Sequence, residues 1–149
     1  MVELIADDLG PRTILRGAAG GTLLHGVVLP SEPCRAAVAG GFAALWLGPD
    51  EFLLLGRAVG VGDFALIDVS DRTLGFRLSG PDAAGLLAGG VALDLALAAF
   101  PVGMCTRTMF EKAEIVLWRR GADDWHIEVA RSFAPYLGAM LAAIAGDAI

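Results

Sequence analysis

The chain has 149 residues, of which 56 % are hydrophobic and 19 % charged, and its net charge is −6. This composition excludes a disordered chain, and the length favours one globular domain over residues 1–149. The pI of about 4.7 and the single lysine argue against partners that need a basic surface, namely nucleic acids and anionic membranes.

The mean hydropathy of +0.64 is high, yet no apolar run approaches the roughly 20 residues that cross a bilayer. The opening MVELIADDLG is acidic where an export signal is basic, so we expect a cytoplasmic protein. Cys34 and Cys105 are then expected to be free thiols rather than a disulfide. The apolar excess has two readings: a simple abundance of Ala and Gly, or surface that a partner covers.

Gly and Pro turns divide the first half of the chain into short segments. In chain order these predict a strand at 12–16, a helix at 18–25, a loop at 29–33, and strands at 36–38, 42–47, 52–55 and 64–69. Residues 42–55 are interpreted as a hairpin, because Gly48-Pro49-Asp50-Glu51 is typical of a tight turn. The strand at 64–69 is nearly all apolar, which predicts a central position in a sheet.

The segment from Asp68 to Leu95 is the most informative for the fold. Residues 73–79 alternate between apolar and polar positions, which predicts a strand with one wet face. Pro81 suits the first turn of a helix, and the carboxylate of Asp82 lies near the positive end of the helix dipole. We expect this helix at 82–89, ended by a pair of glycines.

The second half predicts more strands and a long final helix. In chain order we expect a short helix at 92–100, strands at 105–110, 114–119 and 125–130, and a helix capped by Ser132 and ended by Gly146. Apolar residues recur at helical spacing through this last segment. The mixture of adjacent strands and few helices indicates an α+β fold, with helices packed on a largely antiparallel sheet.

Few groups could build a catalytic or metal site. His126 alternates with the apolar residues of its strand, so it and Glu128 are expected on the opposite face, exposed to solvent. Two His and two Cys, far apart in sequence, do not have metal-ligand spacing. A nucleophilic pair of Cys105 with His126 stays open, because the two could lie on neighbouring strands. We assign no catalytic, cofactor-binding or metal-binding residue.

Two further segments resemble sites only superficially. Residues 17–21 are glycine-rich but lack the spacing of a phosphate loop, and a turn explains them. Asp68 and Asp71 flank Ser70, and loop carboxylates of this kind are more typical of turn caps than of acid–base pairs.

Arg107, Arg131 and Trp118 are the candidates for contact with a partner. Arginine pairs with carboxylates in a bidentate way and is enriched at interfaces. For the two arginines, a structural ion pair and a partner contact are therefore both open. Trp118 lies in a predicted strand and is assigned to the core or to an interface.

Several short motifs form an ordered set along the chain. They are LWLGPDEFLL at 45–54, DVSDR at 68–72, LSGPDA at 78–83, LDL at 93–95, FPVG at 100–103, TRT at 106–108 and RSFAPYL at 131–137. Over residues 12–145 the set resembles the gamma subunit of heterotetrameric sarcosine oxidase.

The resemblance implies a fold related to the folate-binding domain of the glycine-cleavage T-protein. It implies alpha, beta and delta subunits as partners, in a complex that oxidises sarcosine to glycine and produces hydrogen peroxide. The methyl carbon passes to tetrahydrofolate or leaves as formaldehyde. FAD, FMN, NAD, zinc and tetrahydrofolate are expected on the partner subunits and none on this chain. We therefore expect a non-catalytic assembly subunit, with a homo-oligomer as an alternative state of the isolated chain.

The chain departs from this family at residues 56–63. Family members usually have a helix here, whereas this segment is too short and glycine-rich to form one, so we expect the sheet to be open at this point. Two alternative functions stay open. One is an independent folate-binding module, on fold analogy alone. The other is a subunit of a related demethylating flavoenzyme that acts on a different N-methyl substrate.

Overall fold

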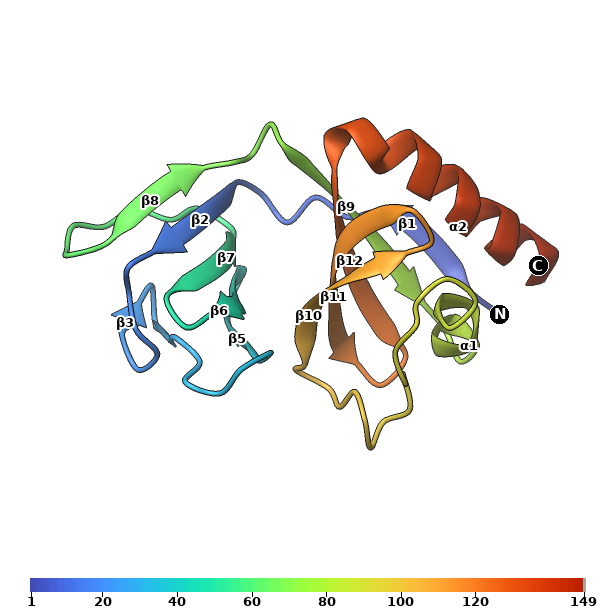
Figure 1. Ribbon diagram of the computed structural model, residues 1–149, viewed down its shortest axis with the longest axis horizontal. Helices are drawn as coiled ribbons and strands as arrows, with labels where there is room; N and C mark the ends of the chain where they lie inside the picture. The colour runs from blue at the N-terminus through green and yellow to red at the C-terminus, as the bar shows by residue number, and fades with distance from the viewer. Residues whose placement is uncertain (149) are drawn as a thin grey trace. The chain divides into compact units, whose positions relative to one another are not determined.

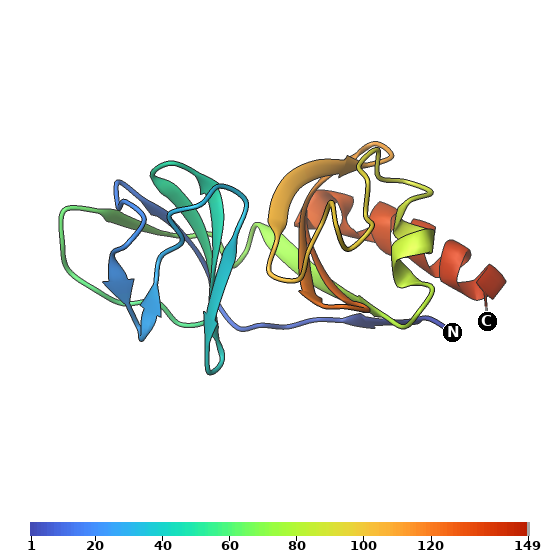
Figure 2. The ribbon, with the colours of Figure 1, turned by 90° about the horizontal axis from the view of Figure 1, so that it is seen from below.

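The computed structural model describes residues 1–148, and contacts divide the chain into two compact units (Figure 1, Figure 2). Unit 1 comprises Met1–Asp8 and Arg72–Ile149, and unit 2 comprises Leu9–Asp71. Both units lie within residues 1–149, the span for which the sequence predicts one domain. Strand pairs in the described chain are antiparallel, and helices α1 and α2 belong to unit 1, which confirms the α+β class.

Unit 2 is a five-stranded sheet with a small ribbon. The sheet has the order β5-β6-β7-β2-β8. Its strands are β2 (Arg12–Arg16), β5 (Ala36–Ala39), β6 (Phe42–Gly48), β7 (Glu51–Leu55) and β8 (Ala65–Asp68), and the ribbon pairs β3 (Leu23–Leu24) with β4 (Val27–Val28). The predicted strand at 12–16 and the hairpin at 42–55 are confirmed.

Two predictions in unit 2 are wrong. The helix expected at 18–25 is replaced by the β3–β4 ribbon, because His25 (φ 51°) and Gly26 (φ 77°) both take the left-handed conformation that a two-residue hairpin turn requires. The strand expected at the centre of the sheet, β8, lies at its edge, because β2 already pairs with β7 on its other side. Residues 57–63 contain no helix, as expected.

Unit 1 is built on a second five-stranded sheet, of order β1-β9-β12-β11-β10. Its strands are β1 (Glu3–Ala6), β9 (Thr73–Ser79), β10 (Cys105–Phe110), β11 (Ala113–Gly121) and β12 (Asp124–Ala130), and its helices are α1 (Ala83–Leu87), the 3-10 turn η1 (Arg131–Phe133) and α2 (Ala134–Ala148). The predicted strands in this unit are confirmed. The sequence analysis missed β1, which brings the start of the chain beside β9.

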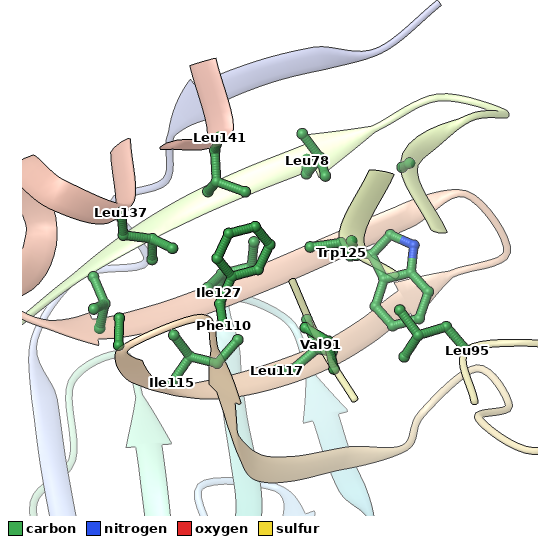
Figure 3. Close-up of a cluster of buried hydrophobic side chains, with 14 of the residues drawn as sticks. Leu78, Val91, Leu95, Phe110, Ile115, Leu117, Trp125, Ile127, Leu137 and Leu141 are labelled. Carbon is green, nitrogen blue, oxygen red and sulfur yellow. The ribbon is translucent and has the colours of Figure 1, made fainter. Parts of the chain in front are cut away.

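The core of unit 1 lies between this sheet and its helices. Figure 3 shows Leu137 and Leu141 of α2 pointing toward Ile127 and Phe110 of the sheet. These side chains are 2 % exposed or less, and Trp125, Ile127 and Val129 share the core face as predicted. The helical spacing of the buried positions of α2 therefore fixes which side of the helix meets the sheet.

The helix boundaries differ from the predictions. Helix α1 ends at Leu87, and α2 begins at Ala134, after Ser132 has entered the 3-10 turn, so Ser132 does not cap it. Helix α2 also continues past Gly146 to Ala148, because this glycine keeps a helical backbone instead of the positive φ that ends a helix.

The helix expected at 92–100 does not form. The Asp94 carboxylate accepts the N–H of Ala96, and the backbone turns at Phe100. The Arg119 guanidinium, 4 % exposed as a residue, donates to the carbonyls of Leu95 and Phe100 at 2.9 and 2.8 Å. Because these carbonyls accept hydrogen bonds from Arg119, the segment is held as a loop beside β11.

Gly90 provides a test of the packing around Phe110. A Cβ at Gly90 would lie 2.5 Å from the buried Phe110 ring, so Gly90→Ala should destabilise the protein by about 1–3 kcal/mol. Gly85→Ala is the matched control, since its Cβ meets nothing and alanine should stabilise the helix by about 0.5–1 kcal/mol. Urea unfolding measures both, and equal effects would contradict this packing.

Candidate functional site

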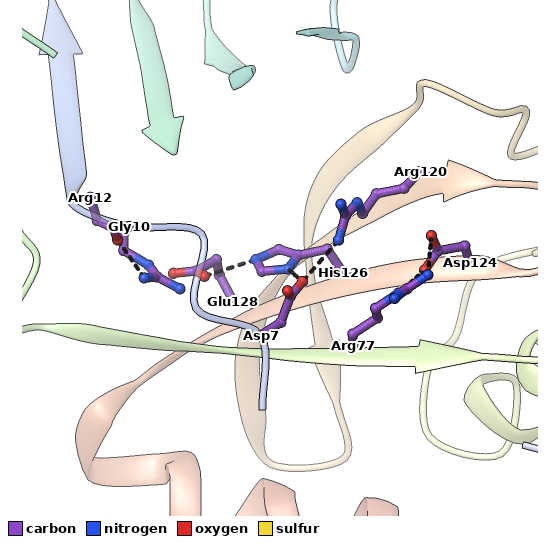
Figure 4. Close-up of polar contacts among 8 residues, drawn as sticks. All are labelled: Asp7, Gly10, Arg12, Arg77, Arg120, Asp124, His126 and Glu128. Carbon is purple, nitrogen blue, oxygen red and sulfur yellow. Dashed lines mark hydrogen bonds and ion pairs between the residues drawn. The ribbon is translucent and has the colours of Figure 1, made fainter. Parts of the chain in front are cut away.

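The sheet of unit 1 has a polar row on the face opposite its core. The strand register places Arg77, His126, Trp118 and Cys105 side by side across β9, β12, β11 and β10. Glu128 and Asp124 lie on the same face of β12, because side chains two apart in a strand point the same way. This row is the strongest concentration of titratable groups that we find in the described chain (Figure 4).

His126 lies at the centre of the row, held by two carboxylates. Its Nδ1 is 2.6 Å from Oδ2 of Asp7, and its Nε2 is 2.8 Å from Oε1 of Glu128. The exposed fraction is 0 % for His126 and 2 % for Glu128, so the prediction that both are exposed is wrong. The alternation gave the correct face, but Asp7 and the Trp118 ring, 6.0 Å away, help to cover the histidine.

The charges around His126 are matched. Nη1 of Arg120 donates to the same Asp7 oxygen at 3.0 Å, and Arg77 makes a two-point contact with Asp124 at 2.8 and 3.1 Å. With a protonated His126, the cluster holds three positive and three negative side chains. Figure 4 shows the Asp7 carboxylate between the imidazole and Arg120.

This geometry shifts two pKa values in opposite directions. Burial disfavours the His126 cation, but hydrogen bonds to Asp7 and Glu128 and their charges outweigh it, so the pKa of His126 lies above 6.5. Burial likewise opposes ionisation of Asp7, but the contact with His126 and the charges of His126, Arg120 and Arg77 bring the pKa of Asp7 below 3.8. Both ring nitrogens contact carboxylates, and the pKa is raised, so the site favours the imidazolium form of His126.

An imidazolium with both N–H groups engaged has no lone pair to offer a proton or a metal ion. The Cys105–His126 pair is also wrong as a neighbouring-strand arrangement, because β11 separates β10 from β12. Within residues 1–148, no group of three His, Cys, Asp or Glu side chains has the geometry to hold a metal ion. The cluster is built to hold chain segments together.

The carboxylate of Asp68 caps a turn, as its sequence context predicts. Oδ1 of Asp68 accepts the Ser70 N–H at 2.9 Å, and hydrogen bonds from Ser70 lower the pKa of Asp68. The Ser70 hydroxyl in turn accepts the Arg12 N–H at 2.9 Å. This carboxylate is used within unit 2.

The three candidates for partner contact differ in exposure. Arg107 on β10 and Arg131 at the start of η1 are exposed, whereas Trp118 is only 5 % exposed. The Trp118 ring packs against His126 and under Arg120, whose Cζ is 5.4 Å from the ring centroid. Trp118 therefore presents little surface to a partner.

Sequence analysis missed Asp7 and Arg119. Asp7 lies 119 positions from His126, and no local pattern links them. Arg119 is buried over the Trp125 ring at 4.5 Å, and burial lowers its pKa despite the nearby charge of Asp123. Arg119 lies two residues after Leu117, so the alternation of β11 places both on the core face. This spacing is the sequence pattern that could have indicated the burial of Arg119.

Comparison with a solved structure identifies the type of fold. The glycine cleavage system aminomethyltransferase T from Bartonella henselae matches with a TM-score of 0.67 and 14 % identity, over 95 % of this chain and 45 % of that one. This likeness shows the fold alone: the chain has an α+β fold of the T-protein type, as expected. No helix within residues 1–148 has the length and apolar character needed to span a membrane.

The family follows from closer relatives. The model of the sarcosine oxidase, gamma subunit family matches residues 17–146, and the chain belongs to this family. The sarcosine oxidase subunit gamma of Arthrobacter sp. is 33 % identical, over 82 % of this chain and 67 % of that protein. A chain of the heterotetrameric sarcosine oxidase from Corynebacterium sp. U-96, in complex with pyrrole 2-carboxylate, matches with a TM-score of 0.86 and 28 % identity. That match covers 98 % of this chain and 84 % of the other.

The raised pKa of His126 predicts how stability depends on pH. A group with a raised folded pKa stabilises the protein fully below its unfolded value of 6.5, and this contribution is lost as the pH rises through the folded pKa. The free energy of unfolding should therefore fall above pH 6.5. His126→Gln should remove this slope, while His25→Gln, in the β3–β4 turn, should keep it. A slope that survives in His126→Gln would contradict the assignment.

Asp7→Asn tests the other half of the contact. Removing the carboxylate leaves the imidazolium short of one charge partner, which should cost about 1.5–3 kcal/mol near neutral pH. Asp63→Asn, at an exposed position in unit 2, should change stability by less than about 0.5 kcal/mol. Because the pKa of Asp7 is lowered, the difference between wild type and Asp7→Asn should shrink as the pH falls below 3.8. Thermal unfolding across this pH range measures it.

Proposed function

We propose that this chain is the gamma subunit of a heterotetrameric sarcosine oxidase and acts there as a non-catalytic assembly subunit. The observation that carries the proposal is the closed polar cluster of unit 1, in a chain that belongs to the gamma subunit family. Both ring nitrogens of His126 contact carboxylates of the same unit, so this buried titratable group serves the fold. Such a chain contributes surfaces rather than reacting groups.

The partners in this proposal are alpha, beta and delta subunits. They would hold FAD, FMN, NAD, zinc and tetrahydrofolate, and would oxidise sarcosine to glycine with transfer of the one-carbon unit to tetrahydrofolate. The complex would work in the cytoplasm. Two features support a role in assembly: the similarity to a chain from a heterotetrameric enzyme, and large apolar side chains left exposed on unit 1, among them Leu97, Val102 and Met109.

Co-expression with the genes that neighbour this one tests the proposal. Purification through a tag on this chain should recover three further subunits in equal amounts, with hydrogen peroxide formed when sarcosine is added. Recovery of this chain alone, with the oxidase activity in the unbound fraction, would overturn the proposal. Binding of tetrahydrofolate by the isolated chain would favour an independent folate-binding module instead.

The exposed arginines of unit 1 are the side chains to test at the interface. Arg107→Ala and Arg131→Ala should each weaken assembly by about 1–2 kcal/mol, because arginine is enriched among the interface residues whose truncation costs most. Arg57→Ala, at an exposed position of unit 2, is the matched control. Pull-down yield at increasing salt gives the measurement. If both variants assemble like the control, these arginines do not contact a partner.

A further inference from the structure

Strand β1 forms one edge of the unit 1 sheet, next to β9. The N–H of Asp7 donates to the carbonyl of Gly75 at 2.9 Å. Hydrogen-bonded pairs alternate along an antiparallel ladder, so Ile5 also turns its backbone groups toward β9. Leu4 and Ala6 therefore direct their N–H and carbonyl groups outward, away from the sheet, where an added strand would meet them.

A groove of about 650 Å³ lies beside this edge, between β1 and the last turns of α2. Its lining consists of Met1, Val2, Glu3, Leu4, Ala142, Ala145 and Gly146. Figure 1 and Figure 2 both show the start of the chain next to the end of α2. The helix wall is made of small residues, which leave space for side chains from outside.

We propose that this groove receives an extended, apolar segment of a partner subunit, which adds to β1 as a further strand. The inference rests on the proposed function, because the partner is another subunit of the same complex. Outward backbone groups on an edge strand recognise an extended chain, and an adjacent apolar groove receives every second side chain of that chain. The edge and the groove are both present here, on one side of β1.

The charges at the groove specify the segment further. The Met1 ammonium is paired with Asp82 at 2.8 Å, and the carbonyl end of α2, whose last turns line the groove, carries partial negative charge. A Lys or Arg at one end of the apolar segment would complement this end of the helix. A second copy of β1 fits less well, because residues 2–6 contain no basic side chain.

Hydrogen exchange on the full chain, alone and in the co-purified complex, tests this proposal. In the chain alone, the Leu4 and Ala6 amides should exchange rapidly and that of Ile5 more slowly. In the complex, the Leu4 and Ala6 amides should slow by about tenfold or more, because each gains a hydrogen bond.

Ala142→Trp should fill the groove and reduce recovery of the complex, whereas Ala143→Trp should not. Both alanines are exposed on α2, but Ala143 does not line the groove. Ala6→Pro removes one outward N–H without filling the groove. Proline is tolerated on an edge strand, so this variant should fold, and the loss of the donor should also weaken assembly. Circular dichroism confirms that each variant is folded.

The outcomes separate this inference from the proposed function. A complex that assembles with Leu4 and Ala6 exchanging as in the free chain, and with Ala142→Trp equal to Ala143→Trp, overturns the groove proposal and leaves the proposed function standing. A dimer of the isolated chain with slow exchange at β1 means self-pairing and also overturns it. If no complex forms, the proposed function fails first, and the groove loses its proposed occupant.

Discussion

Unit 1 depends on a buried cation held between two carboxylates. A charge without a partner is expensive to bury, so His126 is tolerated inside the protein only because Asp7 and Glu128 contact both of its ring nitrogens. The contact with Asp7 joins β12 to the chain that follows β1, and Arg120 brings β11 to the same carboxylate. A single group of matched charges thus connects the β11–β12 hairpin to the start of the chain, which is distant in sequence.

The chain shares its fold with an enzyme, and in unit 1 the buried histidine is used within the fold. The aminomethyltransferase from Bartonella henselae shares the architecture at 14 % identity, and a fold alone does not determine an activity. In unit 1 of this chain, the imidazole that could have moved protons is used to neutralise two acids. Under the proposed function, the features that matter are the exposed apolar side chains and the open edge at β1, because subunits recognise one another through such surfaces.

Local patterns in the sequence predicted most of the strands but little of what the polar groups do. Alternation located 73–79 and 125–130, because side chains on opposite faces of a strand meet different surroundings. It also placed His126 on the correct face, but a period of two says nothing about what covers that face. The residues that cover this face include Asp7, and no sequence pattern near His126 indicates that contact. The helix expected at 92–100 failed for a similar reason: alanine and leucine favour a helix, but Arg119, further along the chain, takes the carbonyls that the helix would use.

The order of the two units along the chain has a practical consequence. Unit 2 is continuous in sequence, whereas unit 1 is interrupted, with its first strand on one side of unit 2 and the rest on the other. No single cut in the polypeptide can therefore separate the two units intact. A fragment that begins at Arg72 would lack β1 and Asp7, and its sheet would expose β9 as a new edge, with His126 left beside one carboxylate instead of two. Isolation of unit 1 requires that residues 1–8 be supplied, either as a separate peptide or through a linker in place of unit 2.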